Sequence, residues 1–126
     1  WLYRLSGGRI ANRIDGTPVC LVSLTRRKSG RTTTVPLMYV PHGEKVLLVA
    51  SLGGAPNNPG WYYSIKAHPD VTIQVGAQRR RMRAHEADAA ERAELWPLAV
   101  RAFRSYELYQ ARTQRTIPVL VCEPAP

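Results

Sequence analysis

The sequence is poor in acidic residues and in side chains that bind metals or form disulfides. Its 126 residues include 9 Asp and Glu against 18 Lys and Arg, with 2 Cys and 3 His. No C-x-x-C pair and no His/Cys cluster at ligand spacing occurs, so no metal site is expected. Cys20 and Cys122 lie in apolar stretches, which indicates buried thiols in a reducing compartment, with a disulfide between adjacent strands as the alternative.

Long apolar runs are also missing. No stretch is long enough to span a bilayer and no secretory leader precedes the body of the chain, so a cytoplasmic protein is expected. The chain begins at Trp1 rather than Met, which indicates that a preceding segment was lost. Such a segment could have carried a peripheral membrane contact, and the oligomeric state stays open.

The motifs of several enzyme classes are absent. The sequence contains no Ser/His/Asp set, no carboxylate pair in a glycine-rich or aromatic context, no P-loop and no G-x-G-x-x-G after a strand. Hydrolysis is therefore weakly supported, and a cofactor that brings its own chemistry fits better.

The charge that is present is positive. A net charge of +9 indicates an anionic partner, which could be nucleic acid, an acidic membrane face or a polyanionic small molecule. The basic residues form two clusters, Arg26–Arg31 and Arg79–Arg83, and the remaining basic residues are scattered along the chain. Strand alternation would place Arg79, Arg81 and Arg83 on one face. That cluster lacks interleaved aromatics, so a solvated face is favoured and no specific nucleic-acid partner is expected.

The order of strand-like and turn-like segments predicts a mainly β (α+β) fold. Strands are expected over residues 19–24, 32–40, 45–51, 71–75, 79–86 and 117–122, with turns at 26–30 and 41–44. A short helix is expected over 61–67. A longer one is expected over 89–103, with Asp88 as its cap and a kink at Pro97. Parallel βαβ units are absent. We therefore predict an antiparallel barrel of six or seven strands with peripheral helices over residues 17–126, after a helical or irregular lead-in at 1–16.

Three features are candidates for a binding site. The turn Arg27-Lys28-Ser29-Gly30 can offer cations, a hydroxyl and backbone N–H groups to a phosphate or carboxylate, although a solvated turn is the plainer interpretation. The Gly- and Pro-rich stretch 52–60 is expected to be neither helix nor strand, and Trp61 after it could stack on a ring or anchor the core. Tyr106 and Tyr109 would share one side of a helical turn, as core residues or as a wall over a bound ring.

Four stretches carry a family resemblance when they are taken in order. They are Leu24-Thr25-Arg26-Arg27-Lys28-Ser29-Gly30 with Val35-Pro36-Leu37; Val49-Ala50-Ser51-Leu52-Gly53-Gly54-Ala55; Asn58-Pro59-Gly60-Trp61-Tyr62 with Lys66-Ala67-His68-Pro69; and Tyr106 to Val121, including Tyr109-Gln110 and Arg115-Thr116-Ile117-Pro118-Val119. Together they resemble the deazaflavin-dependent nitroreductase family of actinobacteria, over nearly the whole chain.

The resemblance implies a split β-barrel related to FMN-binding pyridoxamine-phosphate-oxidase-like proteins. It implies coenzyme F420, a deazaflavin with a phospholactyl-polyglutamate tail, as cofactor. The implied activity is an F420H2-dependent reductase that passes hydride to a small electron-poor acceptor such as a quinone, a nitroaromatic or an activated enone. The alternatives are FMN in the same barrel, an F420 carrier without catalysis, or a basic nucleic-acid module.

The resemblance also assigns roles to residues. Tyr106 and Ser51 are the implied catalytic residues, with a proton from either of them or from solvent. The implied cofactor-binding residues are Arg27, Lys28, Ser29, Arg31, Thr33, Thr34, Val35, Pro36, Leu37, Met38, Val49, Ala50, Ser51, Leu52, Asn58, Gly60, Trp61, Tyr62, Tyr63, Ser64 and Tyr106. The chain departs from the family at Leu52, where relatives carry lysine, and at Met38 and Phe103, where some carry tyrosine. These departures bear on acceptor choice and proton donation.

Overall fold

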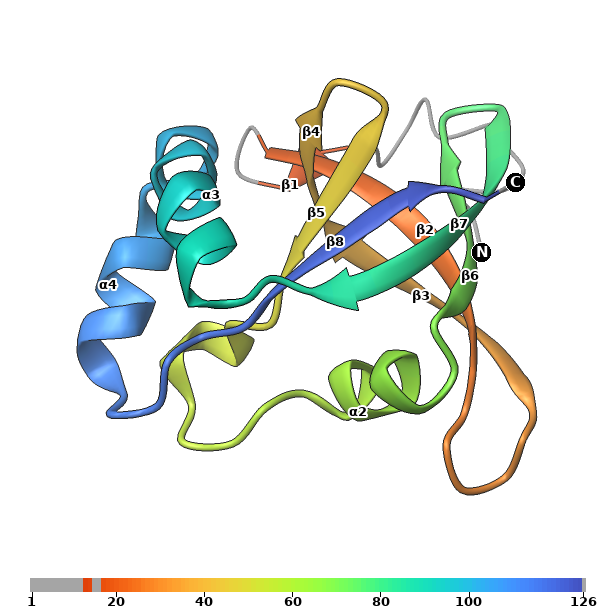
Figure 1. The fold of residues 1–126 in the computed structure, drawn as a ribbon, viewed down its shortest axis with the longest axis horizontal. Helices are drawn as coiled ribbons and strands as arrows, with labels where there is room; N and C mark the ends of the chain where they lie inside the picture. The colour runs from red at the N-terminus through yellow and green to blue at the C-terminus, as the bar shows by residue number, and fades with distance from the viewer. Residues whose placement is uncertain (1–12, 15–16, 126) are drawn as a thin grey trace.

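The computed structural model describes residues 13–14 and 17–125. Its eight strands form one antiparallel sheet in the order β1-β2-β6-β7-β8-β5-β4, with β3 paired to β2 (Figure 1). The strands are β1 (Arg13–Ile14), β2 (Thr17–Thr25), β3 (Thr32–Met38), β4 (Val40–His42), β5 (Lys45–Val49), β6 (Asp70–Val75), β7 (Gln78–Glu86) and β8 (Val119–Pro124). The two-residue β1 corrects the expected helical or irregular lead-in where it is described, and the rest of residues 1–16 lies outside the described residues.

The sheet curls because its two edge strands are neighbours in the chain. Strands β3 and β4 stand at opposite ends of the sheet, yet only Tyr39 separates them. The Tyr39 N–H donates to the Pro18 carbonyl at 3.1 Å, which holds the bend against β2. The predicted mainly β barrel is confirmed, but the expected single strand over 32–40 is wrong at Tyr39. The expected turn over 41–44 is wrong at Pro41 and His42, which pair with β5.

Two apolar layers lie on the two faces of the curled sheet. Strand β5 shows the division, because Val46 and Leu48 belong to the cluster inside the barrel while Leu47 and Val49 belong to the cluster under the outer helices. Strand β8 alternates in the same way. Because both faces of these strands are buried, their sequences read as unbroken apolar runs.

Three α-helices and one 3-10 turn complete the described chain: η1 (Leu52–Gly54), α2 (Gly60–Ala67), α3 (Ala89–Ala102) and α4 (Ser105–Arg112). Helix α2 covers one end of the barrel and buries Ile65 in the inner cluster, while α3 and α4 lie against the outer cluster (Figure 1). The predicted cap is confirmed, since the Glu91 N–H donates to the Asp88 carboxylate at 2.8 Å. The expectation of no helix within 52–60 is wrong at η1 and at Gly60.

The cysteines and the arginine-rich strand behave as their sequence pattern predicts. Both thiols are free and fully buried, and burial raises the pKa of Cys20 and of Cys122 to about 12. Such thiols stay protonated and unreactive in the folded state. On β7, Met82 is buried whereas Arg81 and Arg83 are exposed, so the basic side chains do lie on the outer face.

Candidate functional site

A recess of about 320 Å³ opens where the barrel is split, between β3 and the segment that follows β5. Strand β3 pairs with β2, and β5 pairs with β4 and β8, so no described ladder joins β3 to β5. The residues that line this recess are Pro36, Leu37, Met38, Val49, Ser51, Leu52, Gly53, Pro59, Trp61, Tyr106 and Tyr109. Its volume and its mostly apolar lining with a few polar groups are typical of small-molecule sites.

Two largely buried residues that line the recess, Ser51 and Tyr106, carry hydroxyl groups. Ser51 is 7% exposed and Tyr106 is 1% exposed. Within the described residues neither hydroxyl has a hydrogen-bond partner, although no fully enclosed side-chain polar atom lacks one. Both hydroxyls are therefore not fully enclosed, and because their residues line the recess, they are candidate partners for a ligand bound there.

The Tyr106 ring is held rigidly by other aromatic rings. Phe103 meets it edge-on with ring centroids 5.0 Å apart, and the Trp96 and Tyr109 rings lie 6.4 Å away. Burial, with a contribution from Tyr109, raises the pKa of Tyr106 to about 12. The hydroxyl is therefore protonated at neutral pH and acts as a hydrogen-bond donor toward the recess.

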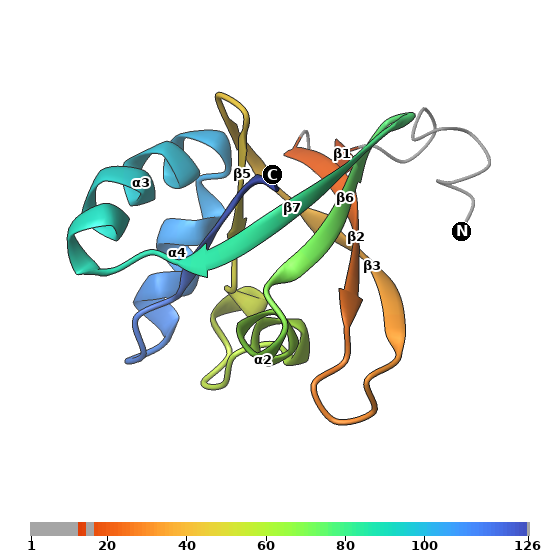
Figure 2. The ribbon, with the colours of Figure 1, turned by 45° about the vertical axis from the view of Figure 1, so that its right-hand side comes forward.

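The basic turn between β2 and β3, residues 26–31, is tied to helix α2. The Arg27 N–H donates to the buried Ser64 hydroxyl at 3.2 Å, and the Arg27 guanidinium lies over the Tyr63 ring, 4.7 Å from its centroid. Gly30 has a φ of 71°, which a side chain would strain. Figure 2 shows the hairpin tip beside α2.

The cations of the basic turn are not neutralised by the protein. Lys28, Ser29 and Arg31 are exposed, and none of the four ion pairs found among the described residues involves this turn. The Ser29 hydroxyl accepts from the Arg31 N–H at 3.2 Å and keeps its own proton to donate. The turn therefore offers unpaired positive charge and a free donor to an anion.

The start of helix α2 connects the recess to the basic turn. Pro59 and Trp61 line the recess, while Tyr63 and Ser64 hold the turn. Pro59 provides no side-chain cap and the Tyr62 N–H donates to the Pro59 carbonyl at 3.1 Å, so the Gly60 and Trp61 N–H groups stay available to an anion. The Trp61 ring also packs on the inner core, so it both anchors the helix and forms recess wall.

Several residues implied by the resemblance have partners within the protein instead. The Tyr62 hydroxyl donates to Glu86 at 2.6 Å, and the Thr33 hydroxyl accepts from the Arg26 side chain at 3.2 Å. The Thr34 and Ser23 hydroxyls are 2.9 Å apart. Val35 packs against the inner core, and Ala50 is fully buried. A cofactor contact through any of these residues stays a prediction.

Tyr109, which the sequence offered as a core residue or as a wall over a bound ring, lines the recess beside Tyr106. Three further residues belong to the site but were not among the residues assigned to it from the sequence. Gly53 and Pro59 line the recess. Arg115 donates to three carbonyls of the adjoining loop and to Asn58. The glycine and proline content of the loop pointed toward Gly53 and Pro59, but no sequence pattern links Arg115 to residues so far along the chain.

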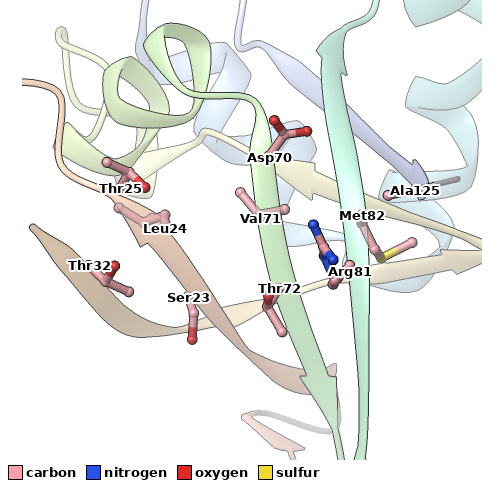
Figure 3. Close-up of a pocket in the computed structure, with 10 residues that line it drawn as sticks. All are labelled: Ser23, Leu24, Thr25, Thr32, Asp70, Val71, Thr72, Arg81, Met82 and Ala125. Carbon is pink, nitrogen blue, oxygen red and sulfur yellow. The ribbon is translucent and has the colours of Figure 1, made fainter. Parts of the chain in front are cut away.

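A second recess of about 240 Å³ lies on the opposite edge of β2 (Figure 3). Strands β2 and β6 stop pairing beyond Ser23 and Thr72, and the opening there is lined by hydroxyls, by Asp70 and by Arg81. It contains none of the residues implied by the resemblance. No group of three or more potential metal ligands occurs in the described part of the chain, and none of its helices has the length and apolarity to cross a membrane.

Comparison with known proteins places this site in context. A family model described as F420H(2)-dependent quinone reductase matches residues 1–124. The F420H(2)-dependent quinone reductase Rv1261c of Mycobacterium tuberculosis (strain ATCC 25618 / H37Rv) is 40% identical over 127 residues, covering 95% of this chain and 83% of that protein. The solved structure of an F420-H2 dependent reductase, FDR-A, is 42% identical with a TM-score of 0.78, covering 84% of this chain and 94% of that one.

A more distant structure shares the fold alone. A Listeria innocua protein assigned as a pyridoxamine 5'-phosphate oxidase has 9% identity and a TM-score of 0.60, over 86% of this chain and 84% of that one. The expected likeness in fold to that group of split barrels is thereby confirmed.

Proposed function

Because this chain belongs to the F420H(2)-dependent quinone reductase family, we propose that its recess and basic turn together hold coenzyme F420 during quinone reduction. The chain is an oxidoreductase that uses coenzyme F420. One observation carries the assignment of the site: an apolar recess with two free hydroxyls lies beside an unneutralised basic turn, across the first turn of one helix.

The residues present fit the two chemically different ends of this cofactor. A planar apolar ring suits a recess walled by Pro36, Met38 and Trp61. A tail bearing a phosphate and carboxylates suits Arg27, Lys28 and the free N–H groups at the start of α2. A ligand without an anionic tail would leave the positive charge of the basic turn without a counter-charge.

The chain's own groups have separate tasks. Reduced F420, when bound, supplies the hydride. Met38, Val49 and Leu52 exclude water from the recess, which strengthens the polar contacts inside it. Ser51 and Tyr106 are the residues whose hydroxyls can hold a quinone oxygen and deliver a proton to it. Because the Tyr106 hydroxyl keeps its proton at neutral pH, it would take a replacement proton from solvent after each transfer.

Anaerobic turnover tests the proposal. The purified protein is mixed with reduced F420 and menadione, and recovery of the oxidised cofactor's absorbance is followed. We expect turnover that saturates in both substrates and that falls in a Ser51→Ala, Tyr106→Phe double variant. A protein that purifies with bound flavin and shows no fluorescence-detected F420 binding would overturn the proposal in favour of FMN. Tight F420 binding without turnover would favour a carrier.

A further inference from the structure

We propose that Arg115 is a positioning residue that fixes one wall of the recess by clamping the loop from Ala50 to Asn58, hereafter the clamped loop. Its effect on cofactor affinity rests on the proposed function, whereas its effect on the loop does not. Arg115 itself does not line the recess.

The guanidinium of Arg115 spans the clamped loop from end to end. Its Nη1 donates to the Ala50 carbonyl at 3.1 Å and to the Asn58 Oδ1 at 2.6 Å. Its Nη2 donates to the Ser51 carbonyl at 2.7 Å, and its Nε donates to the Ala55 carbonyl at 2.9 Å. All three guanidinium nitrogens are therefore engaged, on acceptors 57 to 65 positions earlier in the chain.

The clamped loop is held by two turn hydrogen bonds of its own, by the Ala50 N–H bond to the Pro118 carbonyl and by close packing of Gly54 against α4. Among the described residues, its other hydrogen bonds to distant parts of the chain come from Arg115. Leu52 and Gly53 both have positive φ, at 44° and 63°, so the backbone cannot join a regular ladder. The Ala55 and Ala50 carbonyls have no partner other than Arg115 among the described hydrogen bonds. Ser51, Leu52 and Gly53 lie between these anchor points and line the recess, so the clamp sets where they stand.

Arg115 is itself held from behind by α3 and α4. The Gln110 side chain donates to the Arg115 carbonyl at 2.7 Å and accepts from the Ile117 N–H at 2.9 Å. Arg92 on α3 donates to Gln110 at 3.0 Å and to the Ile117 carbonyl at 2.8 Å. The guanidinium therefore transmits the rigidity of the outer helices to the recess wall.

A lysine could not take over this role. The described part of the chain contains no ion pair of Arg115, so its value here lies in the planar fork of donors rather than in charge neutralisation. An ammonium group presents its donors from one point and cannot reach four acceptors spread along a loop. The geometry therefore predicts that Arg115→Lys behaves like a deletion and not like a conservative change.

Hydrogen exchange on the cofactor-free protein tests the clamp without any activity measurement. Arg115→Ala and Arg115→Lys should speed amide exchange in residues 50–58 by about tenfold or more, with little change on β6 and β7. The matched control is Arg101→Ala, an exposed arginine in the last turn of α3, which should exchange like the wild type. Unchanged exchange in the loop, or a uniform increase over the whole barrel, would overturn the proposal.

Cofactor affinity gives the second readout. A wall displaced by about 1 Å should weaken F420 binding by roughly tenfold to a hundredfold in both Arg115 variants. Millimolar guanidinium should restore part of the affinity in Arg115→Ala and leave Arg101→Ala unaffected, because the free ion can reoccupy the vacated fork. If both Arg115 variants bind F420 with wild-type affinity and added guanidinium changes nothing, the clamp is contradicted. If the wild-type protein itself does not bind F420, the proposed function fails while the exchange experiment still decides the role of Arg115.

Asn58 allows one further check. If Asn58 acts through Arg115, Asn58→Ala should weaken binding in the wild-type background and add almost nothing in Arg115→Ala. Additive losses would instead assign Asn58 a direct contact with the cofactor and remove it from the clamp.

Discussion

The recess and the basic turn are built by opposite means, although one helix joins them. The recess combines buried residues such as Ser51 and Tyr106 with half-buried and exposed ones such as Leu52, and their positions are set by packing around Tyr106 and by hydrogen bonds from Arg115. The turn is exposed, and its links to α2 are a single hydrogen bond to Ser64 and the stacking of Arg27 on Tyr63. The difference indicates that the recess recognises one end of the ligand by shape and that the basic turn recognises the other end by charge. Only binding at the basic turn should respond strongly to salt.

The largest effect is expected from removing the buried Tyr106 ring beside the recess. Tyr106→Ala removes a ring that is 1% exposed and should lower the free energy of unfolding by about 3–5 kcal/mol, because the surrounding rings cannot fill the space. Denaturant unfolding measures this. Tyr106→Phe is the control and should stay within about 0.5 kcal/mol of the wild type, since its hydroxyl has no partner in the described protein. A large loss in the control would mean that the hydroxyl is bonded within the fold.

Removing charge from the turn should affect binding rather than folding. The double variant Arg27→Met, Lys28→Met should bind F420 about ten- to a hundredfold more weakly at low ionic strength, because two charge-assisted contacts to the tail are lost. Fluorescence titrations at low and high salt should show a steep salt dependence for the wild type and a shallow one for the variant. Equal salt dependence would contradict the division of labour between the two regions.

The hydroxyl of Ser51 is expected to have a smaller effect, confined to turnover. Ser51→Ala should reduce kcat by about tenfold, the value of one hydrogen bond made in the recess, and should leave the unfolding free energy unchanged. Steady-state kinetics with menadione measures it. Unchanged kcat would leave Tyr106 or solvent as the source of the proton.

The smallest effect concerns helix α2, the element that the two regions share. Burial works against the Glu86 carboxylate, but hydrogen bonds from Tyr62 and Lys66 outweigh it and lower its pKa below the ordinary value of 4.5. The stabilisation is therefore complete above that ordinary value and is lost as pH falls through the lowered one. Glu86→Gln should cost about 1 kcal/mol at neutral pH and nothing in strong acid. Urea unfolding of both proteins at several pH values checks this, and a constant difference would contradict the assignment.

The sequence carried most of the fold because the strands and caps are local signals. The alternation on β7 and the Asp88 cap each depend on residues close together in the chain, so both could be predicted from the sequence. The bend at Tyr39 could not be predicted, because the chain keeps strand-like residue types where it crosses from one edge of the sheet to the other. The recess wall at Met38 and Leu52 came from the family resemblance. The role of Arg115 depends on partners about 60 residues away and needed the structure.

The most direct measurement of the central claim compares F420 with the same deazaflavin lacking its phosphate and glutamate tail. Titrations of wild-type protein and of the Arg27→Met, Lys28→Met variant form a thermodynamic cycle. We predict that the wild type binds the tailed cofactor about ten- to a hundredfold more tightly than the tail-less one, and that the variant binds both with nearly the same affinity. If the variant keeps the full preference for the tailed cofactor, the basic turn is not the tail site and the account is wrong.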